Sequence, residues 1–161
     1  LVVIAGTNLA PHLLPAGAQP PAIPRFAIKT APAVLDADLA EVASHLRAYA
    51  DPRARVLAPP LAGELRFTAR RAVVVDFKAF PFADAAVLAW RQRLEDVYGS
   101  TPETGFAAAR AMDRRYRSIT DGRLAELRDR YGFDYVLLYR DTPSELPVVF
   151  ANATYSLRRA F

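Results

Sequence analysis

The chain has 161 residues, of which 52% are apolar and 24% charged, and its formal net charge is +4. This length suits one compact domain of roughly 100–150 residues, and the composition excludes wholesale disorder and collagen-like repeats. The absence of cysteine excludes a disulfide framework, thiolate metal sites and a thiol nucleophile. No apolar run reaches the roughly 18 residues that are needed to cross a bilayer.

Residues 1–35 differ in composition from the rest of the chain. Residues 1–6 are apolar, and six of the thirteen prolines lie between Pro11 and Pro32. Because proline fixes φ and removes a backbone donor, this stretch predicts an extended linker. The apolar start is compatible with the end of a membrane helix and equally with a buried strand. We therefore expect an apolar start and proline-rich linker over 1–35, followed by one domain over 36–161.

The first elements of this domain follow from periodicity and from residues that break regular structure. Residues 36–50 carry apolar side chains at three-to-four spacing and predict an amphipathic helix that ends before Pro52. Residues 55–58 predict a short strand, and 65–68 predict either a second short strand or a helical turn. The continuous β-branched run within 72–77 predicts a strand that is buried on both faces at the centre of a parallel sheet.

The remaining elements are expected as helices over 84–98, from about 101 onward and over 121–131, a strand over 135–139, and a hairpin formed by 147–150 and 155–157. Gly99 and Gly132 mark the ends of two of these helices. Helices that alternate with buried apolar strands indicate an α/β fold. We expect a single layered domain with a mostly parallel central sheet, flanked by helices and closed by a C-terminal antiparallel hairpin.

Sequence motifs of nucleotide binding and of serine nucleophiles are absent. The chain has no glycine-rich phosphate loop and no G-x-S-x-G motif. Its two histidines, His12 and His45, are far apart in the sequence, which argues against a histidine relay or a histidine metal site. We therefore predict no catalytic residue, no metal site and no cofactor.

One cluster of charged residues remains as a candidate ligand site. Arg70 and Arg71 precede the run 72–77, while Asp76 and Lys78 stand at its carboxyl end, where ligands bind in open α/β sheets. In a functional interpretation Asp76 is a base or metal ligand, and the cationic side chains hold a phosphate. In the structural alternative, Asp76 pairs with Lys78 or with an arginine and only closes the end of the strand.

Several runs of the sequence carry a resemblance to a known family. They are Pro59-Pro60, Phe67, Arg70-Arg71-Ala-Val-Val-Val-Asp76-Phe77-Lys78, Pro81-Phe82, Leu88-Ala-Trp90-x-x-Arg93, Arg130-Tyr131-Gly132-x-Asp134-Tyr135-Val136-Leu137 and Val149-x-x-Asn152-x-x-Tyr155-Ser156-Leu157. This pattern resembles a bacterial domain of unknown function, the soluble C-terminal domain of polytopic membrane proteins that are similar to GT-C-type glycosyltransferases. The resemblance covers roughly residues 36–161.

The resemblance implies a membrane-associated domain on the extracytoplasmic side. Its partner would be the membrane-embedded part of the parent protein, with an anionic lipid headgroup or a lipid phosphate as a further partner. The catalytic carboxylates of such enzymes lie among the membrane helices, so no catalytic residue is carried over to this chain. We expect a non-catalytic accessory or interaction domain. The alternative is a small phosphate-ligand-binding domain or enzyme that uses Arg71, Asp76 and Lys78.

A third interpretation, a nucleic-acid-binding module, is suggested by the net positive charge. Acidic residues interleave with the arginines through most of the chain, as in the segments 91–96 and 126–130. Interspersed signs are typical of solvated helix faces and not of a continuous basic stripe. We therefore expect no nucleic-acid partner.

Overall fold

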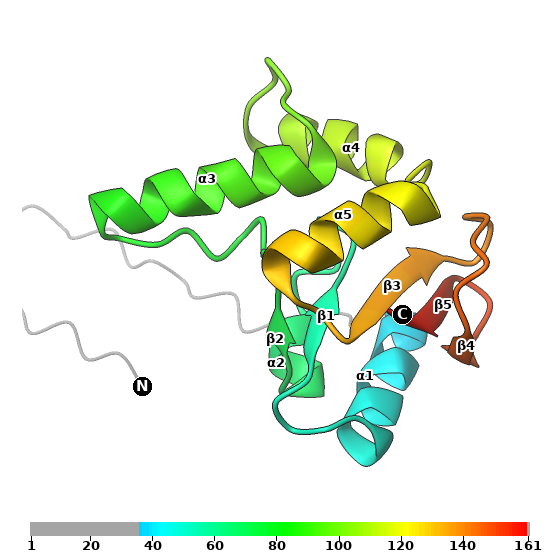
Figure 1. The fold of residues 1–161 in the computed structure, drawn as a ribbon. Coiled ribbons are helices and arrows are strands. Elements are labelled where there is room, and N and C mark those ends of the chain that lie inside the picture. Colours follow the sequence, from blue (N-terminus) through cyan, green and yellow to red (C-terminus); the bar gives the residue numbers. More distant parts are fainter. Residues whose placement is uncertain (1–35, 161) are drawn as a thin grey trace, which may run out of the picture. The chain divides into compact units, whose positions relative to one another are not determined.

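The computed structural model describes residues 36–160, which form five helices and one five-stranded sheet (Figure 1). The predicted apolar start and proline-rich linker, residues 1–35, lie outside the described residues. The elements in chain order are α1 (Ala37–Tyr49), β1 (Arg55–Leu57), α2 (Leu65–Ala69), β2 (Ala72–Val73), α3 (Asp84–Tyr98), α4 (Gly105–Tyr116), α5 (Asp121–Tyr131), β3 (Tyr135–Tyr139), β4 (Val148–Ala151) and β5 (Tyr155–Arg159).

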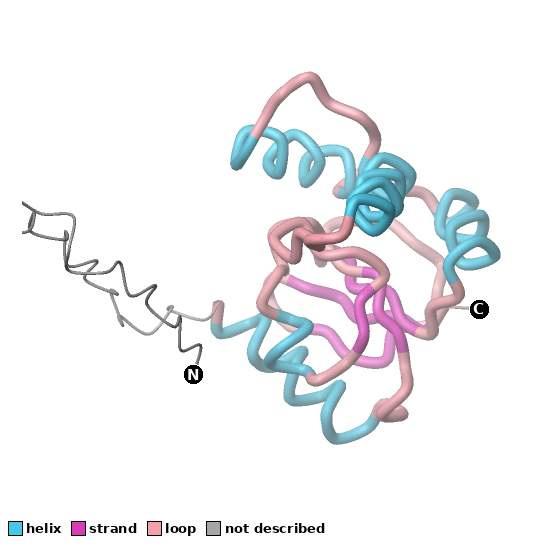
Figure 2. Tube along the Cα trace, turned by 90° about the vertical axis from the view of Figure 1, so that its left-hand side faces the viewer, coloured by secondary structure: helices cyan, strands magenta, loops and turns pink. Residues whose placement is uncertain are grey.

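The strands lie side by side in the order β2-β1-β3-β5-β4. β1 runs parallel to both β2 and β3, whereas β5 runs antiparallel to both β3 and β4. Helix α5 lies on one face of the sheet, and α1 and α2 lie on the opposite face (Figures 1 and 2). Helices α3 and α4 lie beyond the carboxyl ends of β1 and β3. The fold is therefore a mixed α/β domain with helices on both faces of a mixed sheet.

The prediction of a mostly parallel sheet is wrong, because the antiparallel part is the larger one. β1 has only three residues and is followed by Pro59-Pro60, which supply no backbone N–H donors, so each parallel pairing is short. β3 and β5 pair over five positions, from Tyr135 opposite Arg159 to Tyr139 opposite Tyr155. The predicted C-terminal hairpin is confirmed, since β4 and β5 pair antiparallel across a turn at Asn152.

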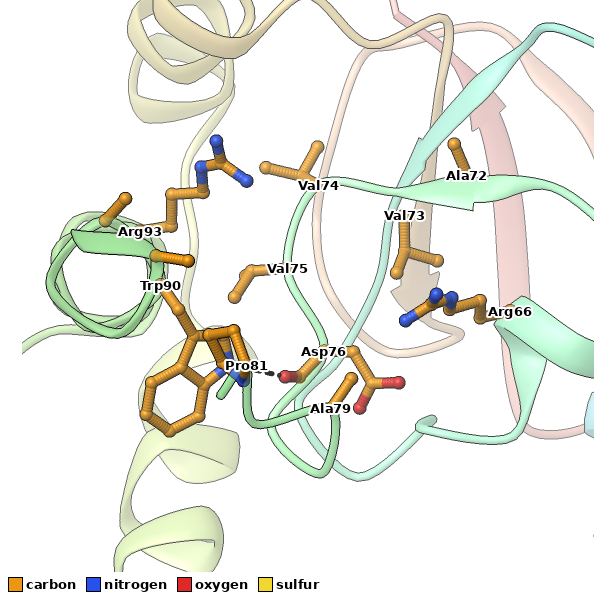
Figure 3. A pocket seen from close by; sticks show the side chains of 12 residues that line it. Arg66, Ala72, Val73, Val74, Val75, Asp76, Ala79, Pro81, Trp90 and Arg93 are labelled. Carbon is orange, nitrogen blue, oxygen red and sulfur yellow. Dashed lines mark hydrogen bonds between the residues drawn. The ribbon is translucent and has the colours of Figure 1, made fainter. Parts of the chain in front are cut away.

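Residues 72–77 do not form the predicted central strand. Only Ala72 and Val73 belong to β2, an edge strand that pairs with β1 alone. Val74 and Val75 are buried nonetheless, because the chain leaves the sheet after β2 and their side chains join the core on the side of α3 (Figure 3). The apolar run therefore predicts correctly that these residues are buried. They are buried beside helix α3, however, and not between two neighbouring strands.

Local signals explain why the other predicted elements form close to where they were expected. Asp36 caps α1 by accepting a hydrogen bond from the backbone N–H of Asp38, and Thr120 caps α5 in the same way. Gly132 ends α5 with φ near +58°, a conformation that suits glycine. The ambiguous segment 65–68 belongs to a helix, α2, and α4 begins at Gly105, later than predicted.

Two buried tyrosines join the helices above the sheet to the ends of the strands. The Tyr98 hydroxyl of α3 donates to the carbonyl of Ala58, at 2.7 Å, just after β1. The Tyr116 hydroxyl of α4 donates to the carbonyl of Leu137 in β3, at 2.9 Å. The two rings meet edge to face with their centroids 5.6 Å apart. Because both hydroxyls are satisfied, the rings contribute their full apolar surface to the core.

Replacing Val74 with aspartate tests whether the segment after β2 belongs to the core. Val74 is 6% exposed, so Val74→Asp replaces a buried apolar side chain with a carboxylate and is expected to lower the free energy of unfolding by several kcal/mol. Val148→Asp on β4 is the matched control, because Val148 is 52% exposed. Urea-induced unfolding measures both variants, and an equally small loss in the two would contradict the burial of Val74.

Candidate functional site

The structure assigns Arg71 to helix capping. Its side chain is buried, and the guanidinium donates to the carbonyls of Leu46, at 3.0 Å, and Ala50, at 2.8 Å, at the end of α1. The last carbonyls of a helix lack intrahelical donors and carry the negative end of the helix dipole. Leu46 also accepts a hydrogen bond from the Ala50 N–H, so the buried cation supplies the donor that the Ala50 carbonyl lacks and faces the negative end of the dipole. Arg71 is therefore turned away from any ligand at the end of β2.

Arg70 and Lys78 are both exposed, and they do not converge with Arg71. Arg70 follows α2 with φ near +52°, in the left-handed region. The backbone N–H of Lys78 donates to Asp76 Oδ1 at 2.8 Å. Within residues 36–160, the ammonium of Lys78 forms no ion pair. The hydrogen bond between Asp76 and Lys78 is therefore made by the Lys78 backbone and leaves its charge free.

Asp76 is the one predicted site residue that lies in a pocket. The residue is 8% exposed, and its backbone carbonyl accepts a hydrogen bond from Trp90 Nε1 at 2.8 Å. Gly63 allows the loop after β1 to approach closely, since a Cβ at this position would lie 3.3 Å from Asp76 Oδ1. Oδ1 is occupied by the Lys78 N–H, whereas Oδ2 has no hydrogen-bond partner among the described residues.

The pocket beside Asp76 has a volume of about 380 Å³ and lies between α2, β2 and α3 (Figure 3). Arg66 of α2 and Arg93 of α3 line it from opposite sides, and neither guanidinium forms an ion pair with a described residue. Arg66 instead lies 5.5 Å from the centroid of the neighbouring Phe67 ring. The rest of the wall is mainly apolar and consists of Ala72, Val73, Val74, Val75, Ala79, Pro81, Ala86, Ala89 and Trp90.

Sequence reasoning did not identify Arg66 and Arg93 as site residues. Arg66 belongs to the segment 65–68, which was predicted as either a strand or a helical turn. The side of the segment on which the Arg66 side chain would lie could therefore not be predicted. Arg93 lies seventeen positions beyond Asp76 and reaches the pocket only because α3 returns beside β2. Its place in the run Leu88-Ala-Trp90-x-x-Arg93 was the available signal, since Trp90 and Arg93 are three residues apart and share one helix face.

An uncovered apolar segment adjoins the pocket. We call residues 79–90, the loop before α3 and the first half of that helix, the aromatic arm. Phe80 is 54% exposed, Phe82 99% and Leu88 70%. The six consecutive apolar residues of Ala85–Trp90 include none that is buried. Figure 1 shows this half of α3 extending beyond the sheet.

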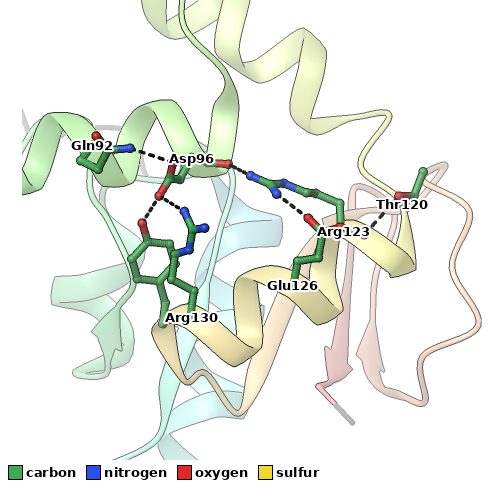
Figure 4. Close-up of polar contacts among 7 residues, drawn as sticks. Gln92, Asp96, Thr120, Arg123, Glu126 and Arg130 are labelled. Atoms are coloured by element: carbon green, nitrogen blue, oxygen red, sulfur yellow. Dashed lines mark hydrogen bonds and ion pairs between the residues drawn. The ribbon is translucent and has the colours of Figure 1, made fainter.

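A second polar cluster joins α3 to α5 around Asp96 (Figure 4). Asp96 accepts hydrogen bonds from the Tyr131 hydroxyl, from Arg130, at 2.7 Å, and from Gln92, at 2.9 Å. The hydrogen bond from Tyr131, aided by Arg130, lowers the pKa of Asp96 below its usual value. Every group of this cluster has a partner, so we assign it a structural role.

Two further findings concern metal binding and membrane spans. Among residues 36–160, no group of three or more His, Asp and Glu side chains is placed to hold a metal ion. None of the described helices combines the length and the apolar character that a membrane span requires.

Comparison with protein families shows a similarity over the first part of the described domain. The family model of a domain of unknown function, DUF6798, matches residues 37–97. The matched segment runs from the start of α1 to the last turn of α3, so it includes both the pocket and the aromatic arm. No curated protein and no solved structure matches the chain. Of the predicted resemblance, a match to a domain of unknown function is shown, over residues 37–97 and not over the whole of 36–161.

The assignment of Arg71 to helix capping is tested by comparing it with its neighbour. Arg71→Gln leaves the buried carbonyl end of α1 without its cation and the Ala50 carbonyl without its donor, and is expected to lower the free energy of unfolding by about 2 kcal/mol. Arg70→Gln is expected to change it by less than about 0.5 kcal/mol, because Arg70 is exposed. Urea-induced unfolding measures both, and equal effects would contradict the capping role.

The lowered pKa of Asp96 predicts how stability responds to acid. A carboxyl whose pKa is lower in the folded state stabilises the fold above its unfolded pKa, about 4, and this contribution is lost as the pH falls through the folded value. Asp96→Asn should therefore melt below the wild type at pH 7, and the difference should shrink below about pH 4. Asp129→Asn, on the exposed face of α5, is the control and should show no such pH-dependent difference.

Proposed function

We propose that residues 36–160 form a non-catalytic interaction domain of a membrane protein, and that the aromatic arm docks this domain on the anionic surface of a bilayer. The observation that carries the proposal is the exposure of Phe80, Phe82 and Leu88, at 54%, 99% and 70%, in an arm whose Trp90 packs only partly against the core. A helix in a soluble domain normally packs its apolar face against the core. Contiguous apolar surface that its own domain leaves uncovered is typical of an interaction site.

The charges beside the arm favour a lipid surface over an apolar protein partner. Lys78 precedes the arm, and Arg93 and Arg66 lie beside it, all three without an ion pair in the described part of the chain. Asp84 is the one acidic residue within the arm. Exposed aromatic side chains flanked by basic residues suit the headgroup region, where each basic residue contributes about 1 kcal/mol on an anionic membrane.

The resemblance to soluble domains of GT-C-type membrane glycosyltransferases supports the more specific part of the proposal. In this view the parent protein is a bacterial membrane glycosyltransferase, and the domain lies on the extracytoplasmic side. The membrane-embedded part would hold the domain near the bilayer, and the aromatic arm would fix its orientation there. The domain would then position the parent protein without contributing catalytic residues.

Vesicle co-sedimentation of the full 161-residue chain tests the docking role of the arm. The chain should bind vesicles that contain phosphatidylglycerol more tightly than vesicles of phosphatidylcholine alone. Burial of one phenylalanine side chain contributes about 2 kcal/mol, so the double variant Phe80→Ser, Phe82→Ser should bind at least about tenfold more weakly. The matched control is Phe106→Ser on α4, because Phe106 is 69% exposed and lies outside the arm.

The control variant decides between specific and general attachment. Phe106→Ser should bind vesicles like the wild type. Circular dichroism establishes that each variant keeps its helices. If the double variant and the control bind alike, or if the wild type ignores both kinds of vesicle, the proposed function is wrong.

A further inference from the structure

We infer that the pocket between α2, β2 and α3 is a binding site for a phosphate ester that carries a hydroxyl group. The volume of about 380 Å³ lies within the range of roughly 300–1,000 Å³ that is typical of small-molecule sites. The inference does not rest on membrane docking, because it concerns the pocket between the arm and the sheet and not the outer surface of the arm. Of the predicted site residues it keeps only Asp76, and it adds Arg66 and Arg93.

The two arginines supply the anion-binding part of the site. Arg66 comes from α2 and Arg93 from α3, and their guanidinium groups approach the pocket from opposite sides (Figure 3). Neither is neutralised by a carboxylate among the described residues. Two like charges on one pocket repel each other, and a bound anion relieves this repulsion. The planar fork of arginine matches the oxygens of a phosphate group and can donate to two of them at once.

Asp76 restricts which anion fits. Asp76 lines the same pocket, and its negative charge repels a bare phosphate, so inorganic phosphate alone is expected to bind weakly. Oδ2 of Asp76 has no hydrogen-bond partner among the described residues and is free to accept one from a ligand. A hydroxyl group close to the phosphate would supply this donor. The charge pattern of two guanidinium groups and one carboxylate therefore selects a hydroxyl-bearing phosphate ester.

The apolar wall gives the ester a defined orientation. Val73, Val75 and Trp90 line the pocket, and Trp90 is fixed by its hydrogen bond to the carbonyl of Asp76. The valine side chains have no polar group, and the one N–H of the Trp90 ring is already bonded to Asp76. The charged end of the ligand is therefore directed to the arginines. The same chemistry occurs in a free ester such as glycerol 3-phosphate and in the headgroup of phosphatidylglycerol. Both sources are therefore distinguished by experiment.

Calorimetric titration of the full chain with glycerol 3-phosphate and with inorganic phosphate tests the site. The ester should bind at one site per chain and more tightly than inorganic phosphate. Arg66→Gln and Arg93→Gln should each weaken binding at least tenfold. Arg53→Gln is the control, because Arg53 is exposed, lies outside the pocket and forms no ion pair with a described residue.

A variant of Asp76 tests its separate role in selecting the ester. Asp76→Asn keeps an oxygen that can accept the Lys78 N–H but removes the negative charge. It should strengthen the binding of inorganic phosphate and reduce the preference for the ester. If Asp76→Asn leaves the ratio of the two affinities unchanged, the carboxylate does not select the ligand and the inferred ligand class is wrong.

A short-chain phosphatidylglycerol, used below its micelle concentration, identifies the source of the ester. Binding of this lipid through Arg66 and Arg93, without binding of glycerol 3-phosphate, assigns the site to a lipid headgroup, whereas the reverse assigns it to a free ester. If neither probe binds, or if Arg53→Gln weakens binding as much as the pocket variants, the inference is overturned. The single variant Phe82→Ser should retain ester binding, because Phe82 is 99% exposed and lies outside the pocket lining, so failure of the docking proposal and failure of this inference are distinguishable.

Discussion

The geometry of this domain depends on the attachment of α3 by one end. Leu94, Val97 and Tyr98 in its last turns are buried, and the Tyr98 hydroxyl is bound to the carbonyl of Ala58. Asp96 adds a polar connection to α5 through Arg130, at 2.7 Å. Toward its amino end, the helix keeps one further hydrogen bond to the described body, from Trp90 to Asp76. The first half of α3 is thereby held away from the sheet and fixed in direction.

This attachment creates the pocket and the aromatic arm together. Residues Ala86, Ala89 and Arg93 recur at three-to-four spacing and line the pocket on one side of α3, whereas Leu88 lies outside the pocket lining and is exposed. A phosphate ester held by Arg66 and Arg93 would join α2 to α3 and stabilise the direction of the arm. Arg66 and Arg93 also supply positive charge beside the docking surface, so a bound ester would fix the direction of the arm while it neutralises part of that charge.

The sequence predicts where each helix or strand forms better than it predicts which other elements pack beside it. Helix α5 and strand β3 lie where they were predicted, because the cap at Thr120, the glycine at 132 and the apolar run 135–139 are encoded within the elements themselves. The run 72–77 misleads because burial by a helix and burial between strands leave the same apolar pattern. Asp76 lies in a pocket although the strand predicted to carry it ends at Val73, and Arg66 and Arg93 reach the same pocket only through the tertiary packing of α2 and α3.

The abundance of arginine is a weak guide to ligand binding, because much of it serves the fold. Arg71 caps the end of α1, Arg55 donates to the carbonyl of Tyr131, and Arg158 donates to the carbonyls of Ser144 and Leu146. One guanidinium can satisfy several carbonyls that lack backbone donors, which a lysine ammonium does less well. The net charge of +4 therefore overstates the basic surface that is available to a ligand. Arginines that line a pocket and have no acidic partner, such as Arg66 and Arg93, are the informative ones.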